Sequence, residues 1–343
     1  MASRGAASNP RNRFERLSLE HDAWTDEDPS LHTEFLRDRT RSLITYNDSP
    51  DVGFDASVNP YRGCEHGCVY CFARPNHEYL GFSAGLDFES RILVKEDAPR
   101  LLRQELSHRS WTPQPIALSG VTDPYQPVER RLRLTRKCLE VLGEFHNPVV
   151  IVTKSDLVMR DADVLGSMAA WQGSVVFVSV TTLVPDLARR MEPRAAPPER
   201  RLAAMARLAR AGVPVGVLAA PMIAGLTDHE LPAILEAGAR AGAAFAGYIP
   251  LRLPYGVAAL FEEWLEAHAP GRKSKVLGRI RSIRGGAMND PRFVTRMQGT
   301  GAYAEEMRAL FDLGIRRAGL RKSPPPLAVD RFRVPGGQGS LFT

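Results

Sequence analysis

The sequence predicts an α/β protein whose core is a partial barrel of six β/α units, with an extended N-terminal segment and a basic C-terminal extension. Short runs of β-branched residues alternate with amphipathic stretches from about residue 41 to residue 270, and the central runs are almost continuously apolar. Such runs are typical of parallel strands buried on both faces, and their alternation with helices indicates β/α units. An eight-unit barrel needs about 250 residues of such units, so two units are missing.

Each unit is predicted from its own pattern of apolar residues. The apolar runs predict strands at Phe54–Asn59, Pro115–Ser119, Val149–Thr153, Val175–Thr181, Val215–Ala219 and Phe245–Pro250. The amphipathic stretches predict helices at Pro99–His108, Thr135–His146, Asp163–Trp171, Pro198–Ala211, Glu230–Ala241 and Gly256–Ala267.

The segments around this core differ from it in composition. Residues 1–40 are polar and read as a tail or a loose wrap. Residues 41–270 form the predicted barrel, and residues 271–320 form a basic extension with a helical stretch at Ala302–Arg317. Residues 321–343 are rich in Pro and Gly, cannot bury a core, and are expected to be extended.

The overall composition is that of an ordinary globular protein, with 44% hydrophobic and 24% charged residues. No window has the apolar length of a membrane span, and the first residues lack the apolar core of a signal peptide. We therefore expect a cytoplasmic protein without a membrane partner.

Three of the four cysteines lie within eight residues, in a C-x3-C-x2-C pattern: Cys64, Cys68 and Cys71. Three thiolates can hold three corners of a [4Fe–4S] cluster, because such clusters are bound by Cys thiolates. The fourth iron then stays open to a small molecule. The pattern resembles the signature of the radical S-adenosylmethionine (SAM) superfamily. In that superfamily the open iron chelates SAM, and reductive cleavage of SAM yields a 5′-deoxyadenosyl radical. The resemblance also implies a reductant such as flavodoxin or ferredoxin.

Other uses of these cysteines remain as alternatives. A zinc site normally has four closed ligands, and here it would need His66 or His77, neither at a familiar spacing. A disulfide framework does not suit a chain of this size with four cysteines. We interpret His66 as a loop residue that hydrogen-bonds near the cluster, and Cys138 as a small core residue of a helix.

Polar residues at the ends of the predicted strands are candidates to bind SAM, because functional groups of parallel barrels collect at the carboxyl ends of strands. Thr122 and Asp123 follow the second strand and offer acceptors to an ammonium group. Lys154 ends the third strand and can pair with a carboxylate as a point charge. Ser179 ends the fourth strand and can meet the carboxylate or ribose. In the superfamily pattern Tyr70, just before the last cysteine, contacts adenine.

Further segments resemble the spore photoproduct lyase-like branch of the superfamily, and more narrowly an uncharacterised bacterial subgroup of it. The resemblance to the branch lies in Asn59–Pro75 and Thr122–Glu129. The resemblance to the subgroup lies in Arg62–Pro75, Leu86–Glu89, Met191–Arg194 and Asn289–Phe293, and it covers most of residues 41–320. The resemblance to the branch implies lyase-like chemistry on DNA, that is, DNA repair or modification. We assign Tyr70, Tyr125 and Glu129 as candidate catalytic residues on this basis.

The chain departs from that branch at two positions. The family uses a cysteine hydrogen donor in the segment that matches Gly120–Asp123, and this chain has Gly120 there. The family also has Tyr-Cys-Tyr at the last cluster cysteine, where this chain has Tyr70-Cys71-Phe72. In that family a hydrogen is abstracted from a thymine dimer in DNA, and the dimer then splits. The resemblance therefore implies a shared core and SAM site without the same dimer reversal.

Two features suggest partners. Residues 271–322 hold 13 Lys and Arg against 4 Asp and Glu, which points to a DNA or RNA substrate or to a solvated face. Gln338, Leu341 and Phe342 resemble a sliding-clamp-binding peptide, although Gly339 replaces its Leu. The leading hypothesis is a radical SAM enzyme that acts on nucleic acid. The alternatives are a radical SAM enzyme for a small molecule or protein, and a non-enzymatic, metal-binding adaptor of the sliding clamp.

Overall fold

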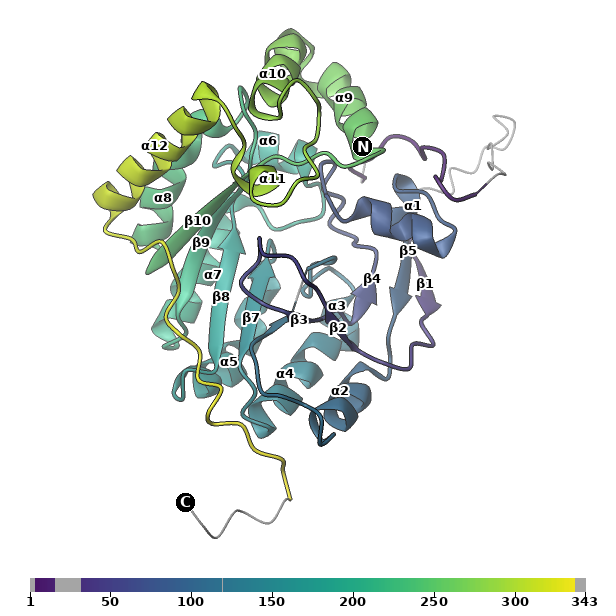
Figure 1. The fold of residues 1–343 in the computed structure, drawn as a ribbon, viewed down its shortest axis with the longest axis vertical. Helices are drawn as coiled ribbons and strands as arrows, with labels where there is room; N and C mark the ends of the chain where they lie inside the picture. Colours follow the sequence, from purple (N-terminus) through teal and green to yellow (C-terminus); the bar gives the residue numbers. More distant parts are fainter. Residues whose placement is uncertain (1–3, 16–31, 119, 337–343) are drawn as a thin grey trace.

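The computed structural model describes residues 4–15, 32–118 and 120–336. Its main sheet has seven strands in the order β10-β9-β8-β7-β6-β3-β2 (Figure 1). Six of them are parallel to one another: β3 (Ala56–Val58), β6 (Ile116–Leu118), β7 (Val149–Thr153), β8 (Ser174–Ser179), β9 (Val215–Met222) and β10 (Phe245–Pro250). The predicted partial barrel of six units is confirmed, and β2 (Ile44–Tyr46) adds an antiparallel edge.

The helices that follow the strands cover the outer face of the sheet (Figure 1). They are α2 (Ala98–Leu106), α4 (Leu134–Glu144), α5 (Ala162–Ala169), α7 (Pro198–Arg210) and α8 (Leu231–Arg240). The sixth helix, α9 (Val257–His268), follows β10 but lies beside α10 (Pro270–Ile283) at the end of the barrel (Figure 1), in a buried cluster separate from the sheet core. All six predicted helices are present, displaced by only one or two residues at most ends. Short segments α3 (Glu129–Leu132) and α6 (Pro185–Met191) lie in the loops after β6 and β8.

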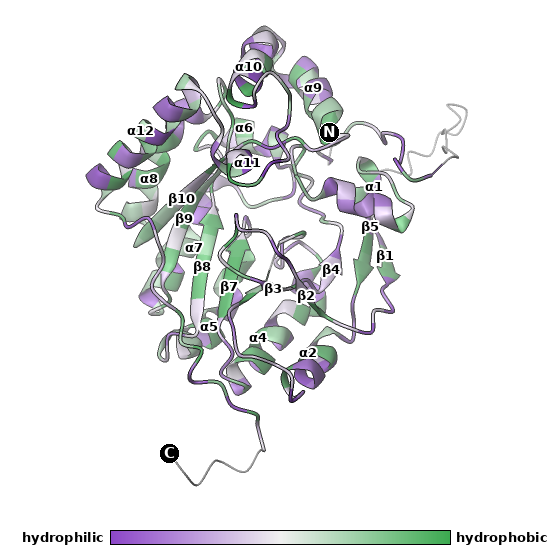
Figure 2. Ribbon diagram, viewed as in Figure 1, coloured by the Kyte–Doolittle hydropathy of each residue, from purple (hydrophilic) through white to green (hydrophobic). Residues whose placement is uncertain are grey.

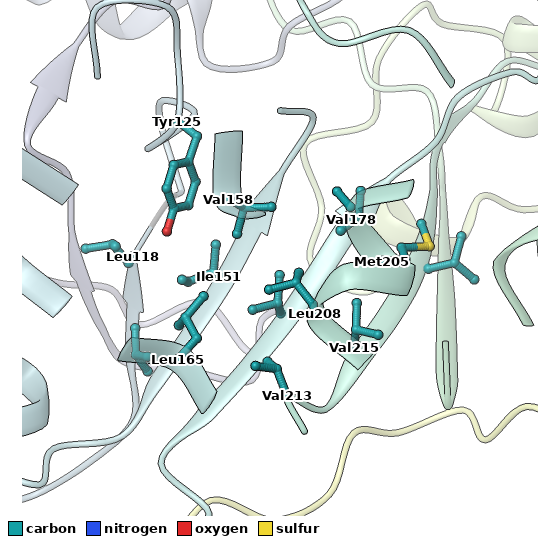
Figure 3. Packing of buried hydrophobic residues seen from close by; sticks show 14 of the residues in the cluster. Leu118, Tyr125, Ile151, Val158, Leu165, Val178, Met205, Leu208, Val213 and Val215 are labelled. Carbon is teal, nitrogen blue, oxygen red and sulfur yellow. The ribbon is translucent and has the colours of Figure 1, made fainter. Parts of the chain in front are cut away.

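The core lies between the sheet and these helices. Strand residues such as Ile151, Val178 and Val215 pack against Leu165 of α5 and Leu208 of α7 (Figure 3). The strands are therefore among the most hydrophobic parts of the molecule, whereas the helices carry polar residues on their outer faces (Figure 2). This packing fixes the carboxyl ends of the strands, where the candidate residues lie.

A second sheet of three short strands lies beside the barrel and was not predicted. It pairs β1 (Glu34–Arg37), β5 (Arg91–Val94) and β4 (Tyr61–Arg62). The polar composition of residues 1–40 predicted a tail for Glu34–Arg37, and the side chains of this strand are indeed mostly exposed. Backbone pairing with β5, rather than burial, holds this strand. A short helix, α1 (Leu86–Ser90), precedes β5.

The basic extension is helical and packs onto the barrel. It contains α10 (Pro270–Ile283), α11 (Thr295–Gln298) and α12 (Ala302–Ala318), the last of which confirms the predicted helical stretch. Met307, Phe311 and Ile315 of α12 belong to the main core. The chain after α12 runs extended along the barrel toward the opposite end (Figure 1), where the backbone N–H of Arg333 donates to the Phe145 carbonyl at 2.9 Å. The clamp-like residues Gln338, Leu341 and Phe342 lie outside the described residues.

No helix in the described part of the chain is long and apolar enough to cross a membrane.

The central strand β7 gives a test of this core. Ile151 is fully buried, so Ile151→Ala should lower the free energy of unfolding by about 2–5 kcal/mol through lost contacts and a cavity. Val152 is only half-buried on the other face, so Val152→Ala should cost less. Urea denaturation of the two variants measures the difference, and equal losses would contradict the packing described here.

Candidate active site

The three cysteines of the motif lie together on the loop that follows β4. Cys64 and Cys68 are buried and Cys71 is half-buried, and all three are free thiols. Burial raises the pKa of Cys68, and the charges of Glu192 and of the other two cysteines raise it further. Burial likewise raises the pKa of Cys71 to about 11, against an opposing effect of Arg74. The thiols are thus close enough to affect one another, and metal binding would release their protons.

The donor set suits an iron–sulfur cluster better than a single ion. Among the residues that the structure describes, no three His, Cys, Asp or Glu side chains are grouped to hold one metal ion. A closed zinc site needs its ligands to converge on one point, whereas each thiolate of a cubane cluster binds a different iron. His77, the other zinc candidate, is buried and its ring nitrogen hydrogen-bonds the Arg91 carbonyl at 3.0 Å. The residues present therefore fit a cluster held by Cys64, Cys68 and Cys71.

A buried arginine holds the backbone of the cysteine loop. The Arg74 guanidinium donates to the Cys68 carbonyl at 2.9 and 3.0 Å and to the Gly85 carbonyl at 2.8 Å. It also pairs with the Glu89 carboxylate, and both side chains are fully buried. Because one charge compensates the other, the pair can be buried next to the cysteines.

The N-terminal residues form a strap on this loop, which we define as residues 4–13. The backbone N–H groups of Gly5 and Ala6 donate to the two oxygens of Glu89 at 2.9 and 2.8 Å. A Cβ atom at Gly5 would lie 1.6 Å from the carbonyl oxygen of Gly67, and Gly67 itself has a φ of +68°. Gly5 is thus required by the close approach of the two backbones, and Gly67 by its positive φ. Further along the strap, Arg13 pairs with Glu78 at 2.6 Å.

The segment after β6 supports the loop from the barrel side. The Gln126 amide donates to the Gly63 carbonyl at 3.2 Å and accepts from the backbone N–H of Glu65 at 3.0 Å. The Glu65 carboxylate accepts from the backbone of Val128 and from Arg194, both at 2.7 Å. The cysteine loop is therefore tied to the barrel as well as to the strap.

A buried network joins the predicted SAM residues Tyr70 and Lys154 to Thr181, Glu192 and Arg201; we call it the Glu192 network. The Glu192 carboxylate accepts from Thr181 at 2.8 Å, pairs with Lys154 at 3.2 Å, and also contacts Tyr70 and Arg201. Lys154 Nζ donates to Thr181 and to the Ala220 carbonyl, both at 2.9 Å, and lies 5.7 Å from the centre of the Tyr70 ring. Burial alone would raise the pKa of Glu192, but Arg201 and Lys154 lower it well below its ordinary value. Glu192 is therefore a carboxylate.

Asp123 lies next to the cysteine loop and is saturated with partners. Its oxygens accept from Thr153 and from the Lys154 backbone at 2.7 Å, and from the Tyr125 backbone at 2.9 Å. His66 Nδ1 lies 3.3 Å from the same carboxylate. Burial would lower the pKa of His66, but Asp123 and Cys64 raise it to about 10, and His66 in turn lowers the pKa of Asp123. His66 is thus a hydrogen-bonding neighbour of the motif, and Asp123 holds both His66 and Lys154 in place.

Ser179 and Thr122 are buried at the same end of the barrel. Ser179 Oγ donates to the Ala220 carbonyl at 3.3 Å, which also receives Lys154 and Thr181. Thr122 Oγ1 lies 3.5 Å from the Tyr61 carbonyl. The structure therefore brings Lys154, Ser179 and Tyr70 into contact with common partners, with Thr122 and Asp123 on the adjacent loop.

Tyr125 and Glu129 face the core. The Tyr125 ring points toward Ile151 and Leu118 (Figure 3) and is 1% exposed. The Glu129 carboxylate is also buried, and it accepts from the Tyr61 hydroxyl and pairs with Arg160 at 2.7 Å. These contacts give both residues a structural role in this conformation. Their predicted contact with a substrate stays a prediction that their burial does not favour.

Several residues of the site were not singled out from the sequence. Glu192 lies in a charged loop at the predicted rim, and Arg74 and Glu89 lie in segments that carry the family resemblance. From the sequence, only their location in these segments indicated that Glu192, Arg74 and Glu89 belong to the site. Arg201 sits in an amphipathic helix and gave none, because its burial depends on the partner that the fold brings to it.

The Glu192 network gives a test by stability. Glu192→Ala leaves the 1% exposed Arg201 without its carboxylate, so it should lower the free energy of unfolding by about 3–5 kcal/mol. Asp186→Ala removes the partner of Arg189 in an exposed pair and should cost less than about 1 kcal/mol.

The same variant has a pH signature. Because the folded-state pKa of Glu192 is lowered, its contribution is present above the ordinary carboxyl pKa of about 4.3 and is lost as the pH falls toward the folded-state pKa. The stability difference between wild type and Glu192→Ala should therefore shrink below about pH 4. A difference that is independent of pH would contradict this account.

The strap gives a second test. Gly5→Ala should push the strap off the cysteine loop, because the new methyl group would collide with the Gly67 carbonyl. We expect less iron and sulfide per chain after anaerobic reconstitution, and faster bleaching in air. Gly53→Ala is the matched control, since nothing lies within 4 Å of its Cβ position. Equal iron content and bleaching rates in the two variants would show that the strap does not protect the site.

Comparisons with known proteins agree with this geometry. The model of the radical SAM superfamily matches residues 58–238. An uncharacterized protein of Mycobacterium tuberculosis is 37% identical over 219 residues, which cover 63% of this chain and 64% of the relative. An uncharacterized protein of Methanocaldococcus jannaschii is 30% identical over 173 residues, covering 50% of this chain and 62% of the relative. The chain thus matches somewhat less than two thirds of these relatives' length.

The fold is also similar to a solved structure. Spore photoproduct lyase complexed with dinucleoside spore photoproduct superposes with a TM-score of 0.59, covering 82% of this chain and 79% of that one, at 17% identity. At this identity the likeness concerns the fold. Together with the family match and the three-cysteine loop, it leads to one conclusion: this chain belongs to the radical SAM superfamily, whose members use a [4Fe–4S] cluster and SAM.

Proposed function

We propose that this radical SAM enzyme acts on nucleic acid, in DNA repair or modification, with lyase-like chemistry. The observation that carries the proposal is the position of the basic helix α10 at the end of the barrel (Figure 1), where its buried residues share one hydrophobic cluster with Cys68 and Tyr70. Its exposed side chains include Arg272, Lys275, Arg279 and Arg281. Such a basic surface neutralises phosphates without reading sequence.

When bound, the cluster and SAM would supply radical chemistry by one-electron cleavage of SAM. The chain's own residues bind and orient. In this proposal Cys64, Cys68 and Cys71 hold the cluster, while Lys154 and Ser179 meet the carboxylate or ribose of SAM. Tyr70 contacts the adenine, and its hydroxyl is fixed by Thr181 at 3.1 Å.

Two further residues position this SAM site. Asp123 acts mainly through the residues it holds, because its oxygens already accept from Thr153 and the Lys154 backbone. Thr122 lies one residue earlier and keeps an acceptor for the ammonium group. Buried Glu192 stays charged and holds the Lys154 ammonium in place.

The hydrogen-return step is where this chain departs from the lyase branch. Gly120 has a φ of +123°, a conformation that favours glycine, although nothing lies within 4 Å of its Cβ position. The backbone at this position therefore does not suit the cysteine of that branch. Phe72, which replaces a tyrosine, has no hydroxyl to relay a hydrogen. We infer a related radical reaction that ends differently from dimer reversal.

The enzyme also needs a reductant, as do other members of its superfamily, and flavodoxin or ferredoxin are candidates. Clamp binding through Gln338, Leu341 and Phe342 remains a prediction. If the enzyme cleaves SAM but nucleic acid has no effect, the substrate is a small molecule or a protein. A preparation that holds zinc, or a cluster that never cleaves SAM, would support the adaptor alternative.

The experiment is SAM cleavage by the anaerobically reconstituted protein, with and without UV-damaged DNA. Cys64→Ala, Cys68→Ala and Cys71→Ala should each abolish release of 5′-deoxyadenosine, because each removes a cluster ligand. Cys138→Ala should retain it, since Cys138 is buried in the helical core. DNA binding should weaken steeply with rising salt. An absence of DNA and RNA binding at low salt would refute the nucleic-acid substrate and leave the radical chemistry standing.

A further inference from the structure

An arginine and a phenylalanine lie in contact beside the cysteine loop, at the carboxyl ends of the barrel strands, which we call the mouth of the barrel. Arg252 follows β10, and Phe72 follows Cys71 directly. The guanidinium carbon of Arg252 lies 5.3 Å from the centre of the Phe72 ring. On its other side, an Arg252 amino group lies 3.4 Å from the sulfur of Met297 in α11. The two side chains therefore form one surface next to a cluster ligand.

Arg252 is half-buried and, among the described residues, lacks the carboxylate partner that Arg74 and Arg201 have. Its Nε is buried without a hydrogen-bond partner among these residues. The Nε of Arg284 is also unpartnered among them, but the other nitrogens of Arg284 donate to backbone carbonyls. By contrast, the Arg74 and Arg201 guanidinium groups each pair with a buried carboxylate. No carboxylate lies within ion-pair distance of Arg252 among the residues that the structure describes. Buried donors are normally satisfied, so the arrangement calls for an acceptor from outside the chain.

The charges around Arg252 also favour an external anion. The charge of Asp51 acts on Arg252, but the Asp51 carboxylate pairs with Arg296 and accepts from the Val294 backbone N–H at 2.6 Å. Arg284 donates to the Leu251 carbonyl at 2.7 Å and to the Arg296 carbonyl at 2.8 Å. Burial and the charge of Arg296 lower the pKa of Arg252, while burial and the charge of Arg252 lower the pKa of Arg284 to about 10. The mouth therefore holds more positive than negative charge, and an anion would relieve it.

Phe72 contributes a planar, apolar surface. Its side chain is 49% exposed, whereas the next residue, Ala73, is buried and the backbone N–H of Cys71 donates to the Cys68 carbonyl at 3.1 Å. An exposed aromatic ring beside a guanidinium group is a stacking platform for a nucleobase, because every base has a π-face. Arginine adds a planar set of donors that matches a phosphate.

We propose that Arg252 and Phe72 form a nucleotide subsite at the mouth of the barrel, in which Arg252 binds a backbone phosphate and Phe72 stacks the adjoining base. The inference rests on the proposed nucleic-acid substrate and names the residues that bring one nucleotide to the cluster. SAM also carries a base and an anionic group, so the test must separate the substrate from SAM.

The probe is thymidylyl-(3′→5′)-thymidine, which has one phosphate, compared with its neutral methylphosphonate analogue. Binding to the reconstituted protein is measured by calorimetry. Wild type should prefer the charged dinucleotide by about tenfold, because a charge-assisted hydrogen bond is stronger than a neutral one. In Arg252→Gln this preference should disappear, while Arg252→Lys should keep part of it. Phe72→Ala should weaken both ligands alike, since it removes the stacking surface.

Controls separate the outcomes. Arg210→Gln removes an exposed arginine at the end of α7, at the opposite end of the barrel, and should bind as wild type does. The affinity for SAM should be unchanged in Arg252→Gln; if SAM and the dinucleotide weaken together, the subsite belongs to SAM and the proposal is wrong. Dinucleotide binding that survives Arg252→Gln with its charge preference intact would also overturn it, and leaves the proposed function standing. A wild-type protein that binds neither dinucleotide nor longer DNA refutes the proposed function itself.

A measurement on the wild type guards against a variant that does not fold. Phenylglyoxal modifies accessible guanidinium groups, and peptide mass spectrometry reads the modification of each arginine. The charged dinucleotide should protect Arg252 several-fold and leave Arg210 unprotected. Equal modification of Arg252 with and without the dinucleotide, at a concentration that saturates binding, would overturn the assignment.

Discussion

The buried ion pair between Arg74 and Glu89 fixes the part of the chain on which everything else depends. The cysteine loop has almost no regular structure, so its conformation must be imposed by contacts rather than by a helix or a strand. Arg74 holds the Cys68 carbonyl, and Glu89 holds the backbone of the N-terminal strap. Since neither charge can be buried alone, the loop, the strap and α1 must form together. A rigid scaffold for three thiolates follows from this one pair.

The barrel was predictable because its signals are local. Strands such as Val149–Thr153 are apolar runs, and the helices between them have amphipathic periods. The small sheet was not predictable for the same reason. Its strand β4 contains two residues, and β1 has mostly exposed side chains. Their pairing with β5 depends on segments far apart in the sequence, which no local pattern records.

Site residues were predictable where their position at the end of a strand determines their location in the fold. Lys154 and Ser179 were found as polar residues at the ends of apolar strands, and they do share the Ala220 carbonyl. Tyr125 shows the limit of such reasoning, because a residue in a loop at the rim can still turn its ring into the core. Arg201 shows the converse: a charged residue of a helix is buried because it pairs with the buried Glu192 carboxylate. Side-chain direction and partners are tertiary properties, and sequence position alone does not determine them.

The charged side chains near the site fall into two groups: those paired with a carboxylate of the protein, and Arg252, which has no such partner among the described residues. Near the cysteines, Arg74, Arg201 and Lys154 each have a carboxylate partner: Arg74 pairs with Glu89, and Arg201 and Lys154 share Glu192. These groups are held in place before any ligand arrives, as orientation of a cofactor requires. Arg252 is different, because Asp51, whose charge acts on it, is paired with Arg296. A positive charge left uncompensated beside an exposed ring is costly in the free protein. The positive charge of Arg252 becomes favourable when an anion binds to it. The unpaired charge that destabilises the free protein therefore favours the binding of a phosphate.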